Sequence, residues 1–286
     1  MQAYNYLLRS VQQLESLYPK EEALQIMYWV YEDVLLLKNT HLQYLDKEIG
    51  LAEESKLQEI LHRLLSGEPL QYVLGYAYFR NKVYKVTKDV LIPRPETEEL
   101  VEWICNELKL KFDGKTQLRI LDIGTGSGCI ALAIKDELRN AEVSGIDISQ
   151  DAIQMAILNA DQLKLTINFK QTSVLEDSGK QWILSSNLDV MVSNPPYIVE
   201  GDKKDMHINV INFEPHIALF VPDEDPLLFY RNIIHLFKEH TTARYLFFEI
   251  SEFQEVALTA LCKFNALSGI FKKDLQGKTR MLQISK

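Results

Sequence analysis

Residues 192–198, Val-Ser-Asn-Pro-Pro-Tyr-Ile, hold the side chains of this chain that most strongly suggest chemistry. They follow a short apolar run, and proline has no backbone N–H to give to a sheet, so Pro195 and Pro196 mark the end of a buried strand. A stiff turn of this kind can present an amide and an aromatic ring in fixed positions. We expect the Asn194 side-chain oxygen and the Pro195 carbonyl to accept N–H groups of a planar ligand that stacks on Tyr197.

The chemistry that suits this turn is transfer of a group to a planar nitrogen. An amide or exocyclic amine is a poor nucleophile because its lone pair is delocalised. Two acceptors aimed at its N–H bonds fix its orientation and draw the lone pair toward an electrophile, which acts through positioning and electrostatics rather than through a strong base. We therefore expect Asn194, Pro195 and Tyr197 to be catalytic, and Pro196 to help bind the substrate. The competing interpretation is a rigid strand terminator that binds nothing.

A glycine-rich loop is the second candidate site. Residues 122–128, Asp-Ile-Gly-Thr-Gly-Ser-Gly, lie between a predicted strand at 118–123 and a predicted helix at 127–138. Glycines there let the backbone approach a ligand closely, although a tight turn can also use them for packing alone. Asp147 ends the next predicted strand, where nucleotide-binding folds place a carboxylate on ribose hydroxyls. Asp147 as a mere helix cap is less favoured, because Ser149 already serves as the cap.

The residue sequence of the glycine-rich loop favours some cofactors over others. A dinucleotide-binding loop would read GxGxxG, whereas this loop reads GTGSG, and no Lys-Ser/Thr pair follows to hold a nucleoside triphosphate. S-adenosylmethionine fits best, because it has ribose hydroxyls and no pyrophosphate. The loop also resembles the first motif of class I methyltransferases. The residues expected to bind this cofactor are Gly124, Thr125, Gly126, Ser127, Gly128, Asp147 and Asn194.

The elements that must position these residues alternate between strand and helix. Strands are predicted at 118–123, 141–148, 167–172, 188–193 and 245–250, and helices at 127–138, 149–159 and 252–264. This alternation predicts an α/β fold with a mostly parallel, doubly wound sheet, and residues 269–275 and 280–285 are expected to pair as its antiparallel edge. The carboxyl ends of such strands meet at one crevice, so Asn194 is expected to face the cofactor.

The N-terminal part has a different pattern. Leucines and an isoleucine recur at helical spacing over residues 57–65, and residues 21–38 read as another helix, so a small helical bundle is predicted. Period-two alternation then predicts a β-hairpin. The expected organisation is a helical substrate-docking domain at 1–74, a hairpin linker at 75–92 and a methyltransferase domain at 93–286.

Composition excludes several classes of protein. The formal net charge is −9 over 286 residues, without a Lys/Arg run to neutralise phosphates, so direct binding of nucleic acid is not expected. Cys105, Cys129 and Cys262 lie in apolar stretches without metal-ligand spacing, and the six histidines do not cluster, so no metal site is expected. No segment reads as a secretory signal or a membrane span, and we expect a cytoplasmic protein with reduced thiols.

Ordered motifs along nearly the whole chain carry a family resemblance. Besides Asn-Pro-Pro-Tyr, they are GEPLQYVLG (67–75), Phe79, LIPRPETE (91–98), Phe213-Glu-Pro, Ala218-Leu219, Tyr230-Arg231 and DLQGKTR (274–280). Together they resemble the HemK/PrmC family of protein-(glutamine-N5) methyltransferases, which act on peptide chain release factors. Two features depart from that family. Ser173 and Val174 stand where many members carry an acidic and an aromatic residue beside the adenine, and the segment 249–251, Glu-Ile-Ser, lacks a glycine that many members have.

The resemblance implies a Rossmann-like class I methyltransferase domain that binds S-adenosylmethionine, with Val174 beside the adenine. It also implies that residues 194–197 hold the glutamine of the Gly-Gly-Gln loop of a class I release factor, docked by the helical domain. Three alternatives remain. A nucleic-acid adenine N6-methyltransferase shares the tetrapeptide but fits the net charge poorly. A sister family methylates a glutamine of a ribosomal protein. A non-catalytic binding module would not need the glycine loop, Asp147 and Asn-Pro-Pro-Tyr together.

Overall fold

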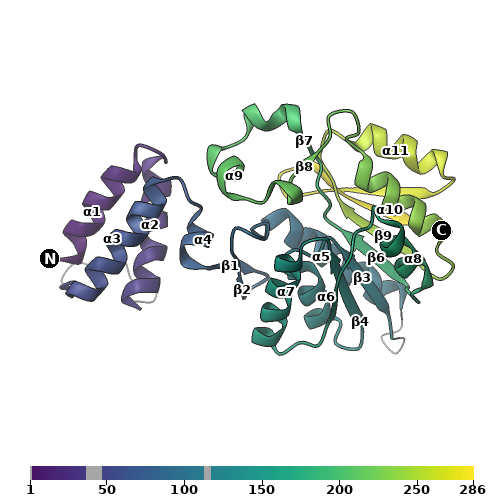
Figure 1. Ribbon diagram of the computed structural model, residues 1–286, viewed down its shortest axis with the longest axis horizontal. Coiled ribbons are helices and arrows are strands. Elements are labelled where there is room, and N and C mark those ends of the chain that lie inside the picture. The colour runs from purple at the N-terminus through teal and green to yellow at the C-terminus, as the bar shows by residue number, and fades with distance from the viewer. Residues whose placement is uncertain (1, 37–46, 113–116) are drawn as a thin grey trace. The chain divides into compact units, whose positions relative to one another are not determined.

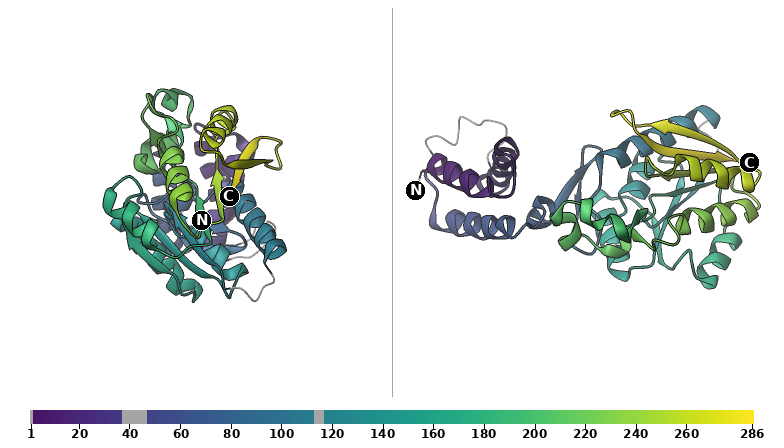
Figure 2. Two further views of the ribbon diagram at one scale, coloured as in Figure 1. Left: turned by 90° about the vertical axis from the view of Figure 1, so that its right-hand side faces the viewer. Right: turned by 90° about the horizontal axis from the view of Figure 1, so that it is seen from above.

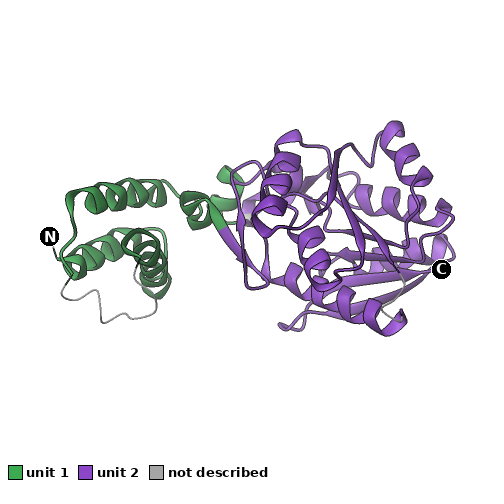
Figure 3. Ribbon diagram, turned by 90° about the horizontal axis from the view of Figure 1, so that it is seen from below, with its two compact units in different colours: residues 1–76, 207–213 green, residues 77–206, 214–286 purple. Residues whose placement is uncertain are grey.

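The computed structural model describes residues 2–36, 47–112 and 117–286. Two compact units share the chain: residues 1–76 with 207–213, and residues 77–206 with 214–286 (Figure 3). The predicted docking domain ended at residue 74, and the segment 207–213 lies within the range predicted as methyltransferase domain. The units therefore differ from a simple cut of the chain, because a segment far along the sequence belongs to the first unit.

The first unit is helical. Its helices are α1 (Ala3–Leu14), α2 (Lys20–Leu35), α3 (Leu51–Leu65), α4 (Leu70–Leu74) and α9 (Ile208–Phe213). Apolar side chains at helical spacing form its core, and Met27 and Leu57 are fully buried. The Asn209 amide of α9 donates to the Tyr18 hydroxyl at 2.8 Å, which ties α9 to this unit. The helix predicted at residues 21–38 spans Lys20–Leu35, and residues 37–38 of the predicted range lie outside the described residues.

A β-hairpin of β1 (Tyr76–Phe79) and β2 (Lys82–Lys85) leads into the second unit. Arg80 and Asn81 both have positive φ, 46° and 59°, as two-residue hairpin turns require. Phe79 and Tyr84 meet edge to face at 5.8 Å and are buried in the core of the second unit. The hairpin predicted as a linker is therefore packed into the core of the second unit.

The second unit is built on a seven-stranded sheet with the order β10-β11-β9-β6-β3-β4-β5. The strands are β3 (Arg119–Ile123), β4 (Glu142–Asp147), β5 (Asn168–Gln171), β6 (Val190–Ser193), β9 (Tyr245–Glu249), β10 (Ser268–Lys273) and β11 (Thr279–Ser285). β11 is antiparallel to both of its neighbours, β10 and β9, and all other pairs of neighbouring strands are parallel. The predicted doubly wound sheet with an antiparallel edge is confirmed.

Helices cover both faces of the sheet, as Figures 1 and 2 show. They are α5 (Pro95–Lys111), α6 (Cys129–Glu137) and α7 (Gln150–Leu163) on one face, and α8 (Asp177–Ser185), α10 (Leu228–Glu239) and α11 (Glu255–Phe264) on the other. Alternate strand residues face opposite sides of the sheet. In β6, Val190 and Val192 pack in the core beneath α5, α6 and α7, and Met191 packs in the core beneath α8, α10 and α11. This two-sided burial explains why the central strands read as continuous apolar runs.

The strand order reverses between β3 and β6. From β3 the chain moves outward through β4 and β5, then returns to add β6 and β9 on the other side. Ile123 is paired with both Ile146 and Ser193, so the loops after β3, β4 and β6 leave the sheet at the same edge. Open α/β sheets bind their ligands at such a reversal.

The loop between β6 and α10 holds short elements. Besides α9, they are β7 (Ile198–Val199) paired in parallel with β8 (Phe220–Val221), and 3₁₀ turns at Glu200–Asp205 and His216–Ala218. None of the helices in the described ranges is both long and apolar enough to traverse a lipid bilayer.

Candidate active site

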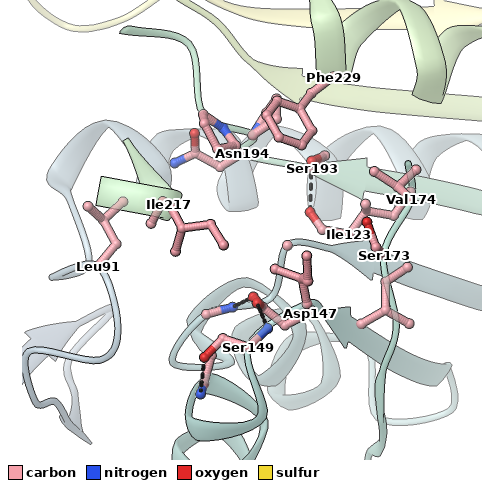
Figure 4. Close-up of a pocket in the computed structure, with 18 of the residues that line it drawn as sticks. Leu91, Ile123, Asp147, Ser149, Ser173, Val174, Ser193, Asn194, Ile217 and Phe229 are labelled. Atoms are coloured by element: carbon pink, nitrogen blue, oxygen red, sulfur yellow. Dashed lines mark hydrogen bonds between the residues drawn. The ribbon is translucent and has the colours of Figure 1, made fainter. Parts of the chain in front are cut away.

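A cavity of about 290 Å³ opens at the carboxyl edge of the sheet in the second unit. Its walls come from the ends of four parallel strands (Figure 4). The strand-end residues that line it include Gly124 and Gly126 after β3, Asp147, Ile148 and Ser149 at β4, Ser173 and Val174 after β5, and Asn194, Pro195 and Pro196 after β6. The fold thus brings the asparagine turn and the glycine loop, 70 residues apart in the sequence, to one cavity.

The glycine loop presents its backbone to this cavity. Gly124 and Gly126 have φ of 74° and 54°, and a Cβ atom at either position would meet no atom within 4 Å. The amides of Gly124 and Thr125 both donate to the Ile146 carbonyl at 2.9 Å, which fixes the loop against β4. Open space over a fixed backbone lets a ligand come closer than a side chain would allow.

Three other loop residues predicted to contact the cofactor do not line the cavity. A Cβ at Gly128 would lie 3.1 Å from Ala156, so this glycine serves the packing of the loop on α7. Thr125 and Ser127 are buried, and the Thr125 hydroxyl donates to Asp122 at 2.7 Å. Burial raises the pKa of the Asp122 carboxyl to about 7, although the bond from Thr125 opposes that rise. The buried side chains of Asp122, Thr125 and Ser127 therefore support the conformation of the loop and do not face the cavity.

The Asp147 carboxylate links the glycine loop to the start of α7. One oxygen accepts the Gly126 amide and the other accepts the Ser149 amide, each at 2.9 Å, and Figure 4 draws both bonds. Ser149 caps the helix by accepting the Ala152 amide at 3.2 Å, as its position predicts. Burial raises the pKa of Asp147, and the backbone bonds oppose this rise. A carboxylate with two bonds still has lone pairs for the hydroxyls of a ligand.

The wall beyond Asp147 is mostly apolar. Ser173 and Val174 line it where the resemblance places an adenine, and Ile148 and Phe229 add apolar surface. The Ser173 hydroxyl accepts the Leu175 amide at 3.2 Å, so it also holds the loop after β5. Phe229 was not singled out from the sequence. Its position next to the Tyr230-Arg231 motif at the start of α10 is the signal that could have pointed to it.

The asparagine turn is held from several sides. The Ser193 hydroxyl donates to the Ile123 carbonyl at 2.7 Å and fixes the end of β6 on β3. The Asn194 amide nitrogen donates to the Thr97 hydroxyl of α5 at 3.3 Å. Tyr197 does not line the cavity. Its ring packs against the core that includes Met191, Tyr230 and Phe248, burial raises its pKa, and its carbonyl accepts the Gln254 amide at 3.5 Å.

Two further segments close the cavity, and sequence reasoning did not assign them a role in it. Leu91 comes from the segment before α5, and Ile217 from the loop after β7. A buried carboxylate joins these segments, because Glu214 accepts the Arg94 guanidinium at 2.6 Å and the Ile92 amide at 3.4 Å. Leu91 and Pro215, from two of the motifs that carry the family resemblance, thus lie at the same cavity as Asn194.

Comparisons with known proteins agree with this geometry. The family described as PrmC N-terminal domain matches residues 6–75, and the one described as Methyltransferase small domain matches residues 104–213. The Release factor glutamine methyltransferase of Flavobacterium psychrophilum is 39% identical over 285 residues, which cover 98% of each chain. The chain belongs to the release factor glutamine methyltransferase family. The family member of Bacteroides thetaiotaomicron is 38% identical over 95% of each chain.

Solved structures support the fold of this family member. A human methyltransferase 10 domain containing protein covers 70% of this chain and 86% of its own, with a TM-score of 0.54 and 18% identity. The N-terminal domain of human METTL16 in complex with SAH covers 91% of this chain and 92% of its own, with a TM-score of 0.52 and 16% identity. At such identities the likeness concerns the class I methyltransferase fold.

Proposed function

We propose that this release factor glutamine methyltransferase places one methyl group on the side-chain nitrogen of the glutamine in the Gly-Gly-Gln motif of class I release factors. One observation carries the proposal: Asn194 and Pro195 line the same cavity as Asp147 and the open glycine backbone. An acceptor pair for a planar nitrogen therefore stands beside a site for a nucleoside. Family membership supplies the substrate class, and the geometry supplies the way this chain would act on it.

The residues present fit S-adenosylmethionine. Asp147 offers acceptors for two ribose hydroxyls, the backbone at Gly124 and Gly126 leaves room for the amino-acid part, and the apolar wall with Ile148 and Val174 suits an adenine ring. When bound, this cofactor supplies a methyl group on a positively charged sulfur, and transfer to an amide nitrogen releases one proton. None of the described Cys, His, Asp and Glu side chains form a cluster that could hold a metal.

Asn194 and Pro195 would do the positioning. The Asn194 oxygen and the Pro195 carbonyl accept the two N–H bonds of the substrate amide, which turns its lone pair toward the methyl group and stabilises the positive charge that develops on nitrogen. Pro196 stiffens the turn. We propose that Tyr197 supports this turn from behind, because its ring packs into the core and does not line the cavity.

The helical first unit is proposed to dock the release factor. One glutamine side chain offers few contacts, so recognition needs surface distant from the reacting nitrogen. The net charge of −9 disfavours direct binding to nucleic acid. We place the work of the enzyme in the cytoplasm, where translation termination provides its substrate.

Incubation with labelled cofactor tests the proposal. The full-length protein is offered separate pools of release factor, ribosomes and DNA, and the products are digested and analysed by mass spectrometry. We expect a mass gain of one CH₂ group on the fragment that contains Gly-Gly-Gln, with fragmentation placing it on the glutamine side chain. Label on DNA adenine or on a ribosomal protein, with none on the release factor, would replace the proposal with one of the other activities.

A further inference from the structure

A buried carboxyl group lies behind the asparagine turn, and the proposed chemistry does not use it. Glu249 ends β9, is 3% exposed, and accepts the Thr97 hydroxyl at 2.6 Å. The same hydroxyl accepts the Asn194 side-chain amide at 3.3 Å. Glu249, Thr97 and Asn194 therefore form a chain of hydrogen bonds that runs from the core to the cavity wall.

Each bond in this chain fixes the direction of the next. An ionised carboxylate can only accept, so the Thr97 proton must point to Glu249. The Thr97 oxygen then offers only lone pairs toward Asn194, so the asparagine must turn its NH₂ group to Thr97. The Asn194 side-chain oxygen remains available as an acceptor, because the hydrogen bonds of the described residues include none to it.

We propose that Thr97 and Glu249 are positioning residues that hold the Asn194 amide with its oxygen toward the substrate nitrogen. The inference rests on the proposed function of Asn194 as an acceptor. A flipped Asn194 would present NH₂ to the substrate NH₂, two donors facing each other, and would lose the acceptor that orients the lone pair. The side-chain amide has no such preference by itself, because its oxygen and nitrogen ends have nearly the same shape.

The surroundings of Glu249 favour this role over a stabilising one. No ion pair to Glu249 is present in the part of the chain that the structure describes, and a buried carboxylate without one lowers stability. The Tyr230 hydroxyl donates to the Glu249 backbone carbonyl at 3.0 Å and leaves the carboxyl group to Thr97. Such a group is retained at a cost in stability, which is common where it serves the site.

The protonation of Glu249 is expected to control the chain. Burial raises its pKa to about 7, opposed mainly by the hydrogen bond from Thr97 and less by the nearby Arg280 charge and Asn194 amide. The titratable groups that face it from the packed elements are Glu96 of α5, Cys129 of α6, Tyr197 of the turn, Tyr230 of α10 and Arg280 of β11. A protonated Glu249 can donate to the Thr97 oxygen, which frees the Thr97 proton for the Asn194 oxygen and permits the flipped amide.

Two nearly isosteric variants and one conservative control test the proposal on the full-length enzyme. Thr97→Val removes the hydroxyl, Thr97→Ser keeps it, and Glu249→Gln keeps the shape while adding a donor. We expect Thr97→Val to lower kcat by about tenfold or more, with the KM for release factor and the Kd for cofactor changed by less than about threefold. Thr97→Ser should stay within about threefold of the wild type in kcat.

The pH profile separates positioning from packing. In the wild type and in Thr97→Ser, kcat at saturating cofactor should fall as pH drops below about 7, because Glu249 becomes protonated. That fall should be absent in Glu249→Gln. Asp122, a second carboxyl with a pKa near 7, is intact in every variant, so a fall that it causes would persist. Equal kcat in Thr97→Val and Thr97→Ser, or an unchanged profile in Glu249→Gln, would overturn the proposal.

A readout without turnover separates this inference from the proposed function. With ¹⁵N-labelled asparagine, the Asn194 NH₂ signals are identified by their loss in Asn194→Asp. In the wild type they should shift with pH around the Glu249 midpoint, and in Thr97→Val they should not. If the wild type shows this shift but methylates no release factor, the proposed function fails and the positioning stands. If it methylates the factor and the NH₂ signals ignore Thr97 and Glu249, the positioning fails alone.

Discussion

The side-chain amide of Asn159 binds both backbone groups of Lys85. The Lys85 amide donates to the Asn159 oxygen at 2.7 Å, and the Asn159 nitrogen donates to the Lys85 carbonyl at 3.0 Å. The same nitrogen donates to the Ser127 carbonyl at 2.9 Å, and Asn159 is fully buried. One side chain of α7 therefore ties strand β2 of the hairpin to the glycine loop.

Asn159→Asp tests this tie while keeping the shape of the side chain. The acid can still accept from Lys85, but it brings an oxygen against the carbonyls of Lys85 and Ser127. We expect the free energy of unfolding to fall by about 2–4 kcal/mol, as for a buried group that loses its donors, together with weaker cofactor binding. Denaturant titration and calorimetry measure the two effects.

Gln162→Glu is the matched control for that change. Gln162 also lies on α7 and donates to the Val83 carbonyl of the hairpin at 2.8 Å, but it is exposed and does not reach the glycine loop. Its loss should lower the free energy of unfolding by less than about 1 kcal/mol and leave cofactor affinity unchanged. Equal effects of both variants would show that Asn159 has no special role.

The parts of this fold that the sequence predicts are those set by local patterns. Apolar runs located the central strands β3, β6 and β9 to within a few residues, because strands buried on both faces read as continuous apolar stretches. The sequence also predicted that the site lies at the carboxyl ends of the parallel strands, since the loops after these strands meet where the strand order reverses. The alternation located the hairpin, but it did not predict that Phe79 and Tyr84 are buried in the core of the second unit.

Contacts between distant polar residues could not be predicted from one sequence. Asn159 reads as an ordinary helix residue, and nothing local shows that it faces a backbone 74 residues away. Thr97 and Glu249 lie in separate motifs and meet only through the packing of α5 on β9. Tyr197 was expected to stack on the substrate, but its ring packs against the core. Helix α9 has only six residues, which is too short for a helical repeat of apolar residues to be recognised in the sequence.

Asp147→Ala is expected to weaken binding of S-adenosylmethionine by about 1–3 kcal/mol, the range for a hydrogen bond to a charged group. The reason is its place on the cavity wall between Gly126 and Ser149. Isothermal calorimetry measures the change. Asp151→Ala, which removes an exposed carboxylate from the next turn, is the control and should bind normally. Unchanged affinity in a folded Asp147→Ala protein would remove this residue from the site.

Asn194→Ala should lower turnover by about two orders of magnitude or more while cofactor affinity stays within a few fold, because it removes an acceptor that acts in the transition state. Asn194→Asp keeps an acceptor but adds negative charge beside the cofactor sulfonium, so both binding and rate should change. Single-turnover kinetics with whole release factor measure the rates. A full single-turnover rate in Asn194→Ala would contradict the proposed role of this turn.

Asp189 allows a prediction about stability and pH at the other end of β6. Burial raises its pKa, but the guanidinium and backbone amide of Arg119, with the charge of Arg244, hold the pKa below its ordinary value. A lowered pKa in the folded state adds stability above the unfolded pKa of about 4, and this is lost as pH falls through the folded value.

Asp189→Asn should therefore lower the free energy of unfolding by about 1–2 kcal/mol at neutral pH, and the difference from the wild type should shrink toward pH 3. Glu107→Gln, which breaks the i,i+4 pair with Lys111 on α5, is the surface control and should change stability by less than about 0.5 kcal/mol. Denaturation curves at both pH values measure this. A difference between Asp189→Asn and wild type that is the same at both values would contradict the assigned cause.

The substrate prediction concerns the helical first unit. Removing residues 1–76 would be a poor test of docking, because α9 belongs to that unit and Asn209 would lose its bond to Tyr18. Such a truncation changes the loop that follows the asparagine turn as well as the docking surface. Shortening the substrate instead leaves the enzyme intact.

We expect a short peptide that contains Gly-Gly-Gln to be methylated with a kcat/KM about two orders of magnitude or more below that of the whole release factor. The peptide must be ordered from a flexible state and lacks the distant contacts that bind the factor. If docking is the missing part, the whole factor with its glutamine changed to alanine should inhibit methylation of the peptide, because it still occupies the docking surface. Equal kcat/KM for peptide and factor, or no inhibition by the altered factor, would show that the first unit does not select the substrate.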